Sequence, residues 1–327
     1  MLNKNISTST LEAQMIIDAI NKKSRQSFKH HQKALKKQAL YFSPFYRDFV
    51  YKIISSGSLE IIHRGGKGYL EPIKRKSTGF KKRQPNKVCT DINSVDTLPH
   101  ELGHAVDAWF GHNDALTKTV ILSNGKTLKE IFNEEFDSKQ EEIYQAVMSE
   151  YKQIITDNIN EKAYDILMKY MPLYNDLRIY EVDPKNDYCV NKRRIHRILY
   201  NSGFVEAYYL LYTRQCAKIL NNKYSPILDA LSSRYNLDGH LLDHHQHLYY
   251  ELTDDSRPVS ELFANLFEAK VTNKHVQFDE LKKFLPKSFE GFEELFNLFY
   301  ERFMANKRFT SVKRKEAINA NKSILSK

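Results

Sequence analysis

The stretch Leu98-Pro99-His100-Glu101-Leu102-Gly103-His104-Ala105-Val106-Asp107 contains an H-E-x-x-H motif at residues 100–104. Asp96, Thr97 and Pro99 just before the motif are typical of a helix start, and the apolar residues after it keep a helical spacing. On a helix, the two histidines lie one turn apart on the same face. The stretch therefore predicts a helix that presents two imidazole nitrogens to a single point.

This spacing of two histidines around a glutamate is typical of zinc hydrolases. Zinc lowers the pKa of a bound water towards neutrality, and Glu101 is expected to take the proton of that water as it attacks a peptide carbonyl. The alternative is a surface helix whose polar residues are merely solvated. Leu102, Val106 and Trp109 argue against that alternative, because they indicate a buried segment, and buried polar groups need partners. The motif predicts His100 and His104 as ligands of Zn²⁺.

A third protein ligand must come from elsewhere in the chain. The metzincin pattern would require Gly at 107 and His at 110, and this chain has Asp107 and Phe110. The better candidate is Glu261, in an apolar helical segment that also places Asn265 and Glu268 on the same face. A His-His-Glu site leaves the fourth zinc position open for water.

Two further residues are candidates for supporting the ligands from outside the metal shell. Asn265, one turn after Glu261, is expected to accept a hydrogen bond from a ligand histidine and fix its tautomer. Asp107, one turn after His104, is the other candidate for this outer role. Glu206 is the rival third ligand, because it also lies on an apolar helical segment, at residues 203–209.

The zinc motif, together with Y-E-L-T-D-D-S-R-P-V-S-E-L-F-A-N-L-F-E-A at residues 250–269, resembles the catalytic domain of anthrax lethal factor and the related Pro-Pro endopeptidases. The resemblance covers roughly residues 95–112 and 248–270. It implies that His100, His104 and Glu261 bind zinc, that Glu101 is the general base, and that Tyr250 stabilises the tetrahedral intermediate. Tyr250 has a second interpretation, as an aromatic residue that packs with its apolar neighbours.

Length and composition limit the class of protein. The 327 residues, 41% of them hydrophobic, suffice for one large or two smaller domains with a core. We expect no transmembrane segment, because no apolar run approaches the length of a membrane span. The polar N-terminus lacks the apolar block of a secretory signal, and three widely spaced cysteines favour a reducing compartment. These features predict a cytoplasmic protein, or one exported without a cleavable signal peptide.

The net charge of +10 is unevenly distributed. Residues 1–40 carry +6, residues 74–87 carry +7 and residues 301–327 carry +6, so the rest of the chain carries −9. Such basic segments are candidates for binding an anionic partner, and the alternative is a solvated segment that aids solubility. Nucleic acid is a weaker candidate, because Phe80 is the only aromatic residue in the 74–87 segment.

The sequence predicts a mostly helical α+β fold, with a zincin-type metallopeptidase core, a small β-sheet and a large helical insertion. Short strands are expected at residues 59–62 and 88–92, on either side of a glycine-rich turn. The expected organisation is a basic helical arm (1–40), a first half of the core (41–112), the insertion (113–240), a second half of the core (241–305) and a basic tail (306–327).

The function predicted from these patterns is zinc-dependent hydrolysis of a polypeptide substrate, that is, an endopeptidase. One alternative is another intracellular H-E-x-x-H peptidase, associated with nucleic acid or with a regulatory protein. The other is a basic interaction protein in which the zinc motif is a relic without catalytic function.

Overall fold

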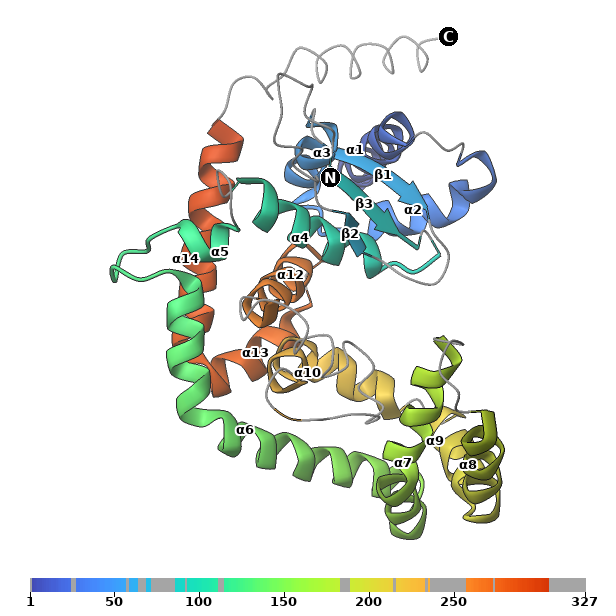
Figure 1. Cartoon of the computed structure of the whole chain (residues 1–327). Coiled ribbons are helices and arrows are strands. Elements are labelled where there is room, and N and C mark those ends of the chain that lie inside the picture. Colours follow the sequence, from blue (N-terminus) through green and yellow to red (C-terminus); the bar gives the residue numbers. More distant parts are fainter. Residues whose placement is uncertain are drawn as a thin grey trace, which may run out of the picture. The chain divides into compact units, whose positions relative to one another are not determined.

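The computed structural model describes residues 2–24, 28–56, 59–63, 69–71, 86–91, 93–110, 115–182, 189–213, 216–232, 235, 257–272 and 274–305 (Figure 1). This part of the chain is mostly helical with one small sheet, which confirms the expected α+β class. Residues 72–85 and 306–327, which hold most of two of the basic segments, lie outside the described residues. None of the described helices combines the length and apolar character needed to cross a bilayer.

The chain divides into two compact units. Unit 1 comprises residues Met1–Leu128, Phe263–Lys274 and Glu290–Lys327, and unit 2 comprises Lys129–Leu262 and His275–Phe289. The segment expected as an insertion, 113–240, is divided between the units: residues 113–128 belong to unit 1 and residues 129–240 to unit 2. Helix α13 (His275–Phe284) packs with α10 (Cys216–Ser232) in unit 2.

The sheet of unit 1 has three strands in the order β1-β3-β2. Strand β1 (Leu59–His63) pairs in parallel with β3 (Asn86–Thr90), and β2 (Tyr69–Glu71) pairs with β3 in the antiparallel sense. The two expected strands are therefore present. Strand β2 was not expected, because its three residues adjoin a glycine-rich stretch that is typical of a turn.

The N-terminal segment does not form an arm separate from the core. Helix α1 (Leu2–Lys23) packs against α3 (Arg47–Ser55), with Ala13, Ile16, Ile17 and Ile20 buried. These four residues follow the spacing of one helical face, so the helix carries an apolar stripe that needs a partner. The lysines after this stripe are typical of a solvated arm, but the buried stripe itself packs α1 against α3. The segment continues as η1 (Lys29–His31) and α2 (Gln32–Tyr41).

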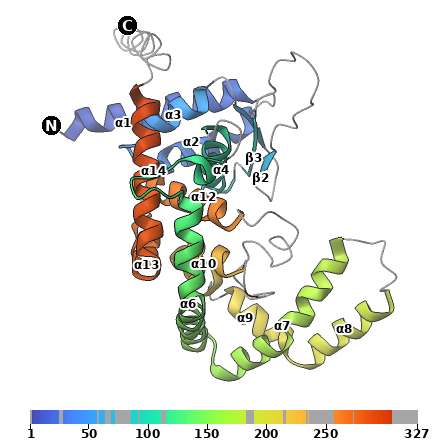
Figure 2. The same cartoon turned by 60° about the vertical axis from the view of Figure 1, so that its left-hand side comes forward.

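An aromatic cluster determines how helix α12 (Arg257–Thr272) is oriented in unit 1. The ring of Phe267 lies 6.2 Å from that of Phe49 on α3 and 6.0 Å from that of Phe296 on α14 (Pro286–Ala305). The ring of Phe263 lies 5.6 Å from that of Phe292, also on α14. Because one face of α12 packs on these rings, the polar residues of its opposite face point towards α4 (Thr97–Phe110). Figure 2 shows α12 next to α4.

Unit 2 is built from helices. Its long helix α6 (Leu128–Asn158) is followed by α7 (Glu161–Val182), α8 (Cys189–Asn201), α9 (Phe204–Thr213) and α10. Buried Glu135 on α6 accepts hydrogen bonds from the backbone N–H groups of Lys287 and Ser288, at 3.0 and 2.7 Å, and from the Ser288 hydroxyl. These donors lie in the first turn of α14, where backbone N–H groups lack helical partners, so Glu135 caps that helix.

Candidate metal centre

Helix α4 carries the H-E-x-x-H motif as the sequence predicts. Its first turn is closed by the His100 backbone N–H, which donates to the Asp96 carbonyl at 3.3 Å. Leu98, Leu102 and Val106 are fully buried, and the helix packs beside β3 and β2. The short helix α5 (Leu116–Thr119) follows it. Burial of this apolar face gives α4 a defined orientation, with His100 and His104 on a partly exposed face.

Gly103 is the point at which α4 and α12 come closest. A Cβ atom built on Gly103 would lie 2.7 Å from the Cα of Ala264, 3.1 Å from its carbonyl oxygen and 3.1 Å from the Cβ of Phe267. A side chain of any size at this position would therefore meet backbone atoms of α12. The glycine permits a backbone approach that places the start of α12 beside the motif histidines.

The close approach brings three of the predicted site residues together. One ligand atom each from His100, His104 and Glu261 lies within 4.8 Å of the others, and Glu261 is only 2% exposed. Glu261 precedes Ala264 by one helical turn, so the contact at Gly103 determines its distance from the histidines. Among the described residues, this is the group whose atoms can share a metal ion.

The donor atoms fit a tetrahedral metal ion. The Nε2 atoms of His100 and His104 face each other at 3.2 Å. Two nitrogens bound at zinc distances in a tetrahedral site lie about 3.3 Å apart, which is close to this separation. All ligand atoms of the group lie within 4.8 Å of one another, and in a tetrahedral site the Glu261 oxygen must approach each nitrogen to about 3.4 Å. A change in side-chain torsion of Glu261 can supply that difference.

Glu101 lies on α4 next to the two predicted ligand histidines and is buried, with 5% of its surface exposed. In the helix it directly follows His100 and precedes His104 by three residues, so its side chain emerges beside the histidine face. A carboxylate in this position has the chemistry expected of a general base.

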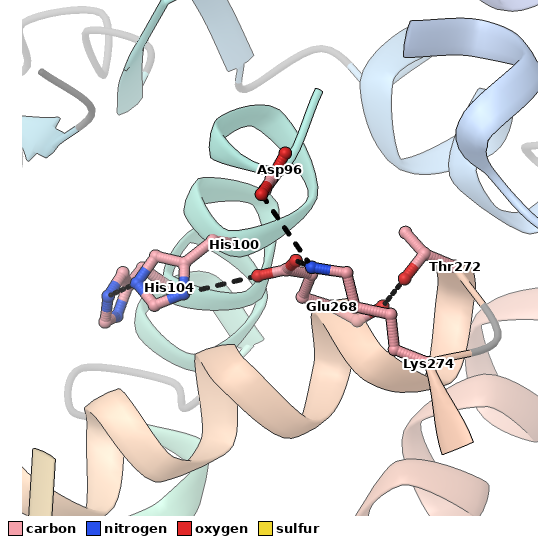
Figure 3. A network of polar contacts seen from close by, with 6 residues as sticks. All are labelled: Asp96, His100, His104, Glu268, Thr272 and Lys274. Carbon is pink, nitrogen blue, oxygen red and sulfur yellow. Dashed lines mark hydrogen bonds and ion pairs between the residues drawn. The ribbon is translucent and has the colours of Figure 1, made fainter. Parts of the chain in front are cut away.

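The structure places Glu268 in contact with His100, one of the predicted metal ligands. Its Oε2 atom lies 3.9 Å from Nδ1 of His100, the ring nitrogen turned away from His104 (Figure 3). Asn265, which the sequence favours for an outer role, is buried on the same helix, 2% exposed. Glu268 lies seven residues after Glu261 and therefore on the same face of α12, so helical spacing could have indicated it.

Asp107, the other candidate for an outer role, is fully buried and holds α5 in place. Its two carboxylate oxygens accept hydrogen bonds from the Thr117 backbone N–H at 2.9 Å and the Thr117 hydroxyl at 3.2 Å. The structure thus places the Asp107 carboxylate in contact with Thr117 of the next helix, α5. The position of Asp107 three residues after His104 does not by itself say whether its side chain contacts that histidine or α5, because sequence spacing alone does not fix side-chain direction.

The rival ligand Glu206 is exposed in the first turn of α9 and is not a member of the His-His-Glu group. Tyr250, implied by resemblance to stabilise the tetrahedral intermediate, lies outside the described residues.

No family model, no curated protein and no solved structure matches this chain. The function of the chain must therefore be inferred from the geometry of α4 and α12 and from the chemistry of the residues they carry.

We expect Gly103→Ala to lower the free energy of unfolding by about 2 kcal/mol. The added Cβ would meet backbone atoms of α12, so the overpacking cost is expected at the upper end of roughly 1–3 kcal/mol, against a gain in helix propensity of about 1 kcal/mol. The variant should also bind zinc more weakly, since the helices must separate. Chemical denaturation of the metal-free chain and zinc titration measure the two effects.

The matched control is Ala108→Gly, an exposed position on the same helix. It alters helix propensity without touching α12, so it should lower stability by about 1 kcal/mol and leave zinc affinity unchanged. A Gly103→Ala variant that is more stable than the wild type and binds zinc equally well would contradict the proposed importance of the close approach.

Proposed function

We propose that this chain is a zinc-dependent endopeptidase of the zincin type, with His100, His104 and Glu261 as the metal ligands and Glu101 as the general base. The observation that carries the proposal is the convergence of two imidazole Nε2 atoms, 3.2 Å apart, with a buried glutamate from a helix distant in sequence. Buried carboxylates are rare unless they are paired or bind a cation.

Two neutral imidazoles and one carboxylate form a donor set that suits zinc and leaves one coordination position for a reactant. Zinc bound there would lower the pKa of water and polarise the carbonyl of the scissile bond. The three protein ligands supply one negative charge to the dication, so the site keeps a net positive charge that favours an oxyanion.

The remaining chemistry belongs to Glu101. Its carboxylate accepts a proton from the attacking water and afterwards donates it to the leaving amine. Burial in α4 keeps the carboxylate beside the histidine face, because the flanking residues Leu102 and Ala105 are fully packed. The single residue thus acts first as a base and then as an acid.

The sheet suggests how an extended polypeptide would bind. β3 is paired on both sides, so the open edges of the three described strands belong to β1 and β2. Of these two, β2 packs against α4. An extended substrate that adds to the edge of β2 by main-chain hydrogen bonds would run beside the zinc helix.

Metal removal and a peptide library test the proposed function together. We expect one zinc per chain in the purified protein, cleavage of a subset of library peptides, loss of cleavage after dialysis against a chelator, and recovery on addition of zinc. Mass spectrometry of the products identifies the cleaved bonds.

Absence of zinc and of cleavage would overturn the proposal and favour a binding protein. Zinc binding without cleavage in the library, followed by DNA-stimulated cleavage that falls steeply with salt, would favour the peptidase associated with nucleic acid.

A further inference from the structure

Glu268 is a buried carboxylate that lies between two partners. Its Oε2 atom is 3.9 Å from Nδ1 of His100, and its Oε1 atom accepts a hydrogen bond from the Lys274 ammonium at 2.5 Å. The side chain is therefore in contact with a proposed metal ligand on one side and a cation on the other. Figure 3 shows the Lys274 ammonium between the carboxylates of Glu268 and Asp96.

Local backbone contacts keep the pair in place. The backbone N–H of Lys274 donates to the Ala269 carbonyl at 2.9 Å, and the Thr272 hydroxyl donates to the Glu268 carbonyl at 2.7 Å. These bonds close the C-terminal end of α12 and turn the lysine back along the helix. The ammonium then reaches Glu268 and lies 3.9 Å from the Asp96 carboxylate, at the start of α4. The lysine thus links the end of α12 to the beginning of the zinc helix.

The surroundings of Lys274 favour its charged form. Burial alone lowers the pKa of Lys274, but the Glu268 carboxylate and the hydroxyl of Tyr41 outweigh burial and raise the pKa above its ordinary value. The ammonium also lies 5.5 Å from the centre of the Tyr41 ring, where a cation is favoured. This positive charge pairs with Oε1 of Glu268, while Oε2 of the same carboxylate lies towards His100.

We propose that Glu268 and Lys274 form a positioning pair that holds His100 in the tautomer with hydrogen on Nδ1 and a free electron pair on Nε2. The inference rests on the proposed metal site, because it is the Nε2 atom that faces His104 and would bind the ion. A carboxylate beside Nδ1 attracts the proton to that nitrogen and limits rotation of the ring.

The distance of 3.9 Å is that of an ion pair and exceeds hydrogen-bond length, and we expect it to shorten when Nε2 binds a cation. Coordination makes the Nδ1–H a stronger donor, which draws it towards the carboxylate. Lys274 holds one oxygen of Glu268 in an ion pair, and Asp96 lies 3.9 Å from the Lys274 ammonium at the start of α4, so the pair positions the ring without touching the substrate.

The first test measures the tautomer in the metal-free protein. In histidine labelled with ¹⁵N, side-chain NMR spectra report which ring nitrogen carries hydrogen, and a His100→Gln spectrum assigns the signal. We expect His100 in the Nδ1–H form in the wild type and a mixture of tautomers in Glu268→Ala. The same mixture in both proteins would overturn the proposal, whatever the chain does as an enzyme.

The second test measures metal affinity by competition with a chromophoric chelator, together with the visible absorption spectrum of the cobalt-substituted protein. We expect Glu268→Ala to bind zinc roughly 10–100-fold more weakly and to alter the cobalt spectrum. Glu268→Gln keeps the side-chain volume, so it should fold normally and show a smaller loss. Lys274→Met should weaken zinc binding in the same direction.

Glu293→Gln is the matched control. It breaks an ion pair of the same length, 2.5 Å, made by Lys270 on the same helix. Unchanged zinc affinity in this control, with a loss in Glu268→Ala, supports the positioning pair. Equal zinc affinity in the wild type and both Glu268 variants would overturn the pair and leave the proposed zinc site intact. A wild type that binds neither zinc nor cobalt would overturn both.

Discussion

A Glu261→Ala variant is expected to purify without zinc and to lose peptide hydrolysis. Removing this side chain leaves two protein ligands on one helix, which is one fewer than a hydrolytic zinc site requires. We expect zinc affinity to fall by more than about 100-fold, beyond the range for loss of an outer contact. Metal analysis of the protein after gel filtration measures the stoichiometry, and circular dichroism checks that the helices remain.

The effect of zinc on stability distinguishes a ligand from a structural carboxylate. Glu261 is 2% exposed, so Glu261→Ala removes a buried carboxylate in either case. Zinc should raise the unfolding temperature of the wild type and leave that of the variant unchanged, because a ligand stabilises only the form that binds it.

Glu206→Ala is the control for this experiment, since Glu206 is an exposed glutamate on an apolar helix. It should keep one zinc per chain and full activity. Loss of zinc in Glu206→Ala, with retention in Glu261→Ala, would show that the third ligand has been wrongly assigned.

A Glu101→Gln variant is expected to keep its zinc and to hydrolyse peptides about 10²–10⁴-fold more slowly, the usual contribution of a general base. The amide has nearly the same shape as the carboxylate but cannot accept the proton of the attacking water. Because Glu101 is not among the proposed ligands, the metal stoichiometry should remain one. The ratio kcat/KM for a cleaved library peptide, measured beside the zinc content, tests both parts of this expectation.

Glu134→Gln provides a matched control for the loss of one glutamate charge, since Glu134 is an exposed residue of α6. Its activity should equal that of the wild type. Cleavage by Glu101→Gln at an undiminished rate, with zinc present, would exclude Glu101 as the base and would require another proton acceptor.

Much of the local structure could be predicted from the spacing of residues along the chain. The helical spacing of Leu98, Leu102 and Val106 predicts helix α4 and its buried face. In α12, the aromatic residues and the acidic residues fall on different faces of a helix, which predicts the face that carries Glu261. The two strands that pair in parallel could also be recognised. Strand β2 could not, because three residues next to glycines carry too weak a pattern and the strand forms by pairing with β3.

The contact of Glu268 with His100 illustrates the limit of helical periodicity. Asn265 and Glu268 both lie on the face of α12 that carries Glu261, and spacing alone does not say which of them meets a given histidine. Which side chain meets His100 depends on where α4 crosses α12, and that crossing is determined by the contact of Gly103 with Ala264. The contact of Asp107 is likewise not contained in the spacing of α4, because its partner Thr117 lies on the next helix, α5.

The amino-acid sequence by itself determined the identity of the candidate ligands and base, since the motif at residues 100–104 and the acidic face of α12 depend only on local spacing and side-chain chemistry. Only the tertiary structure decided that ligand atoms of His104 and Glu261, separated in sequence by 156 residues, lie within 4.8 Å of each other and that Glu268 lies 3.9 Å from His100. The physical reason is packing: the aromatic rings behind α12 and the absent side chain at Gly103 set a distance between two helices that no local pattern contains.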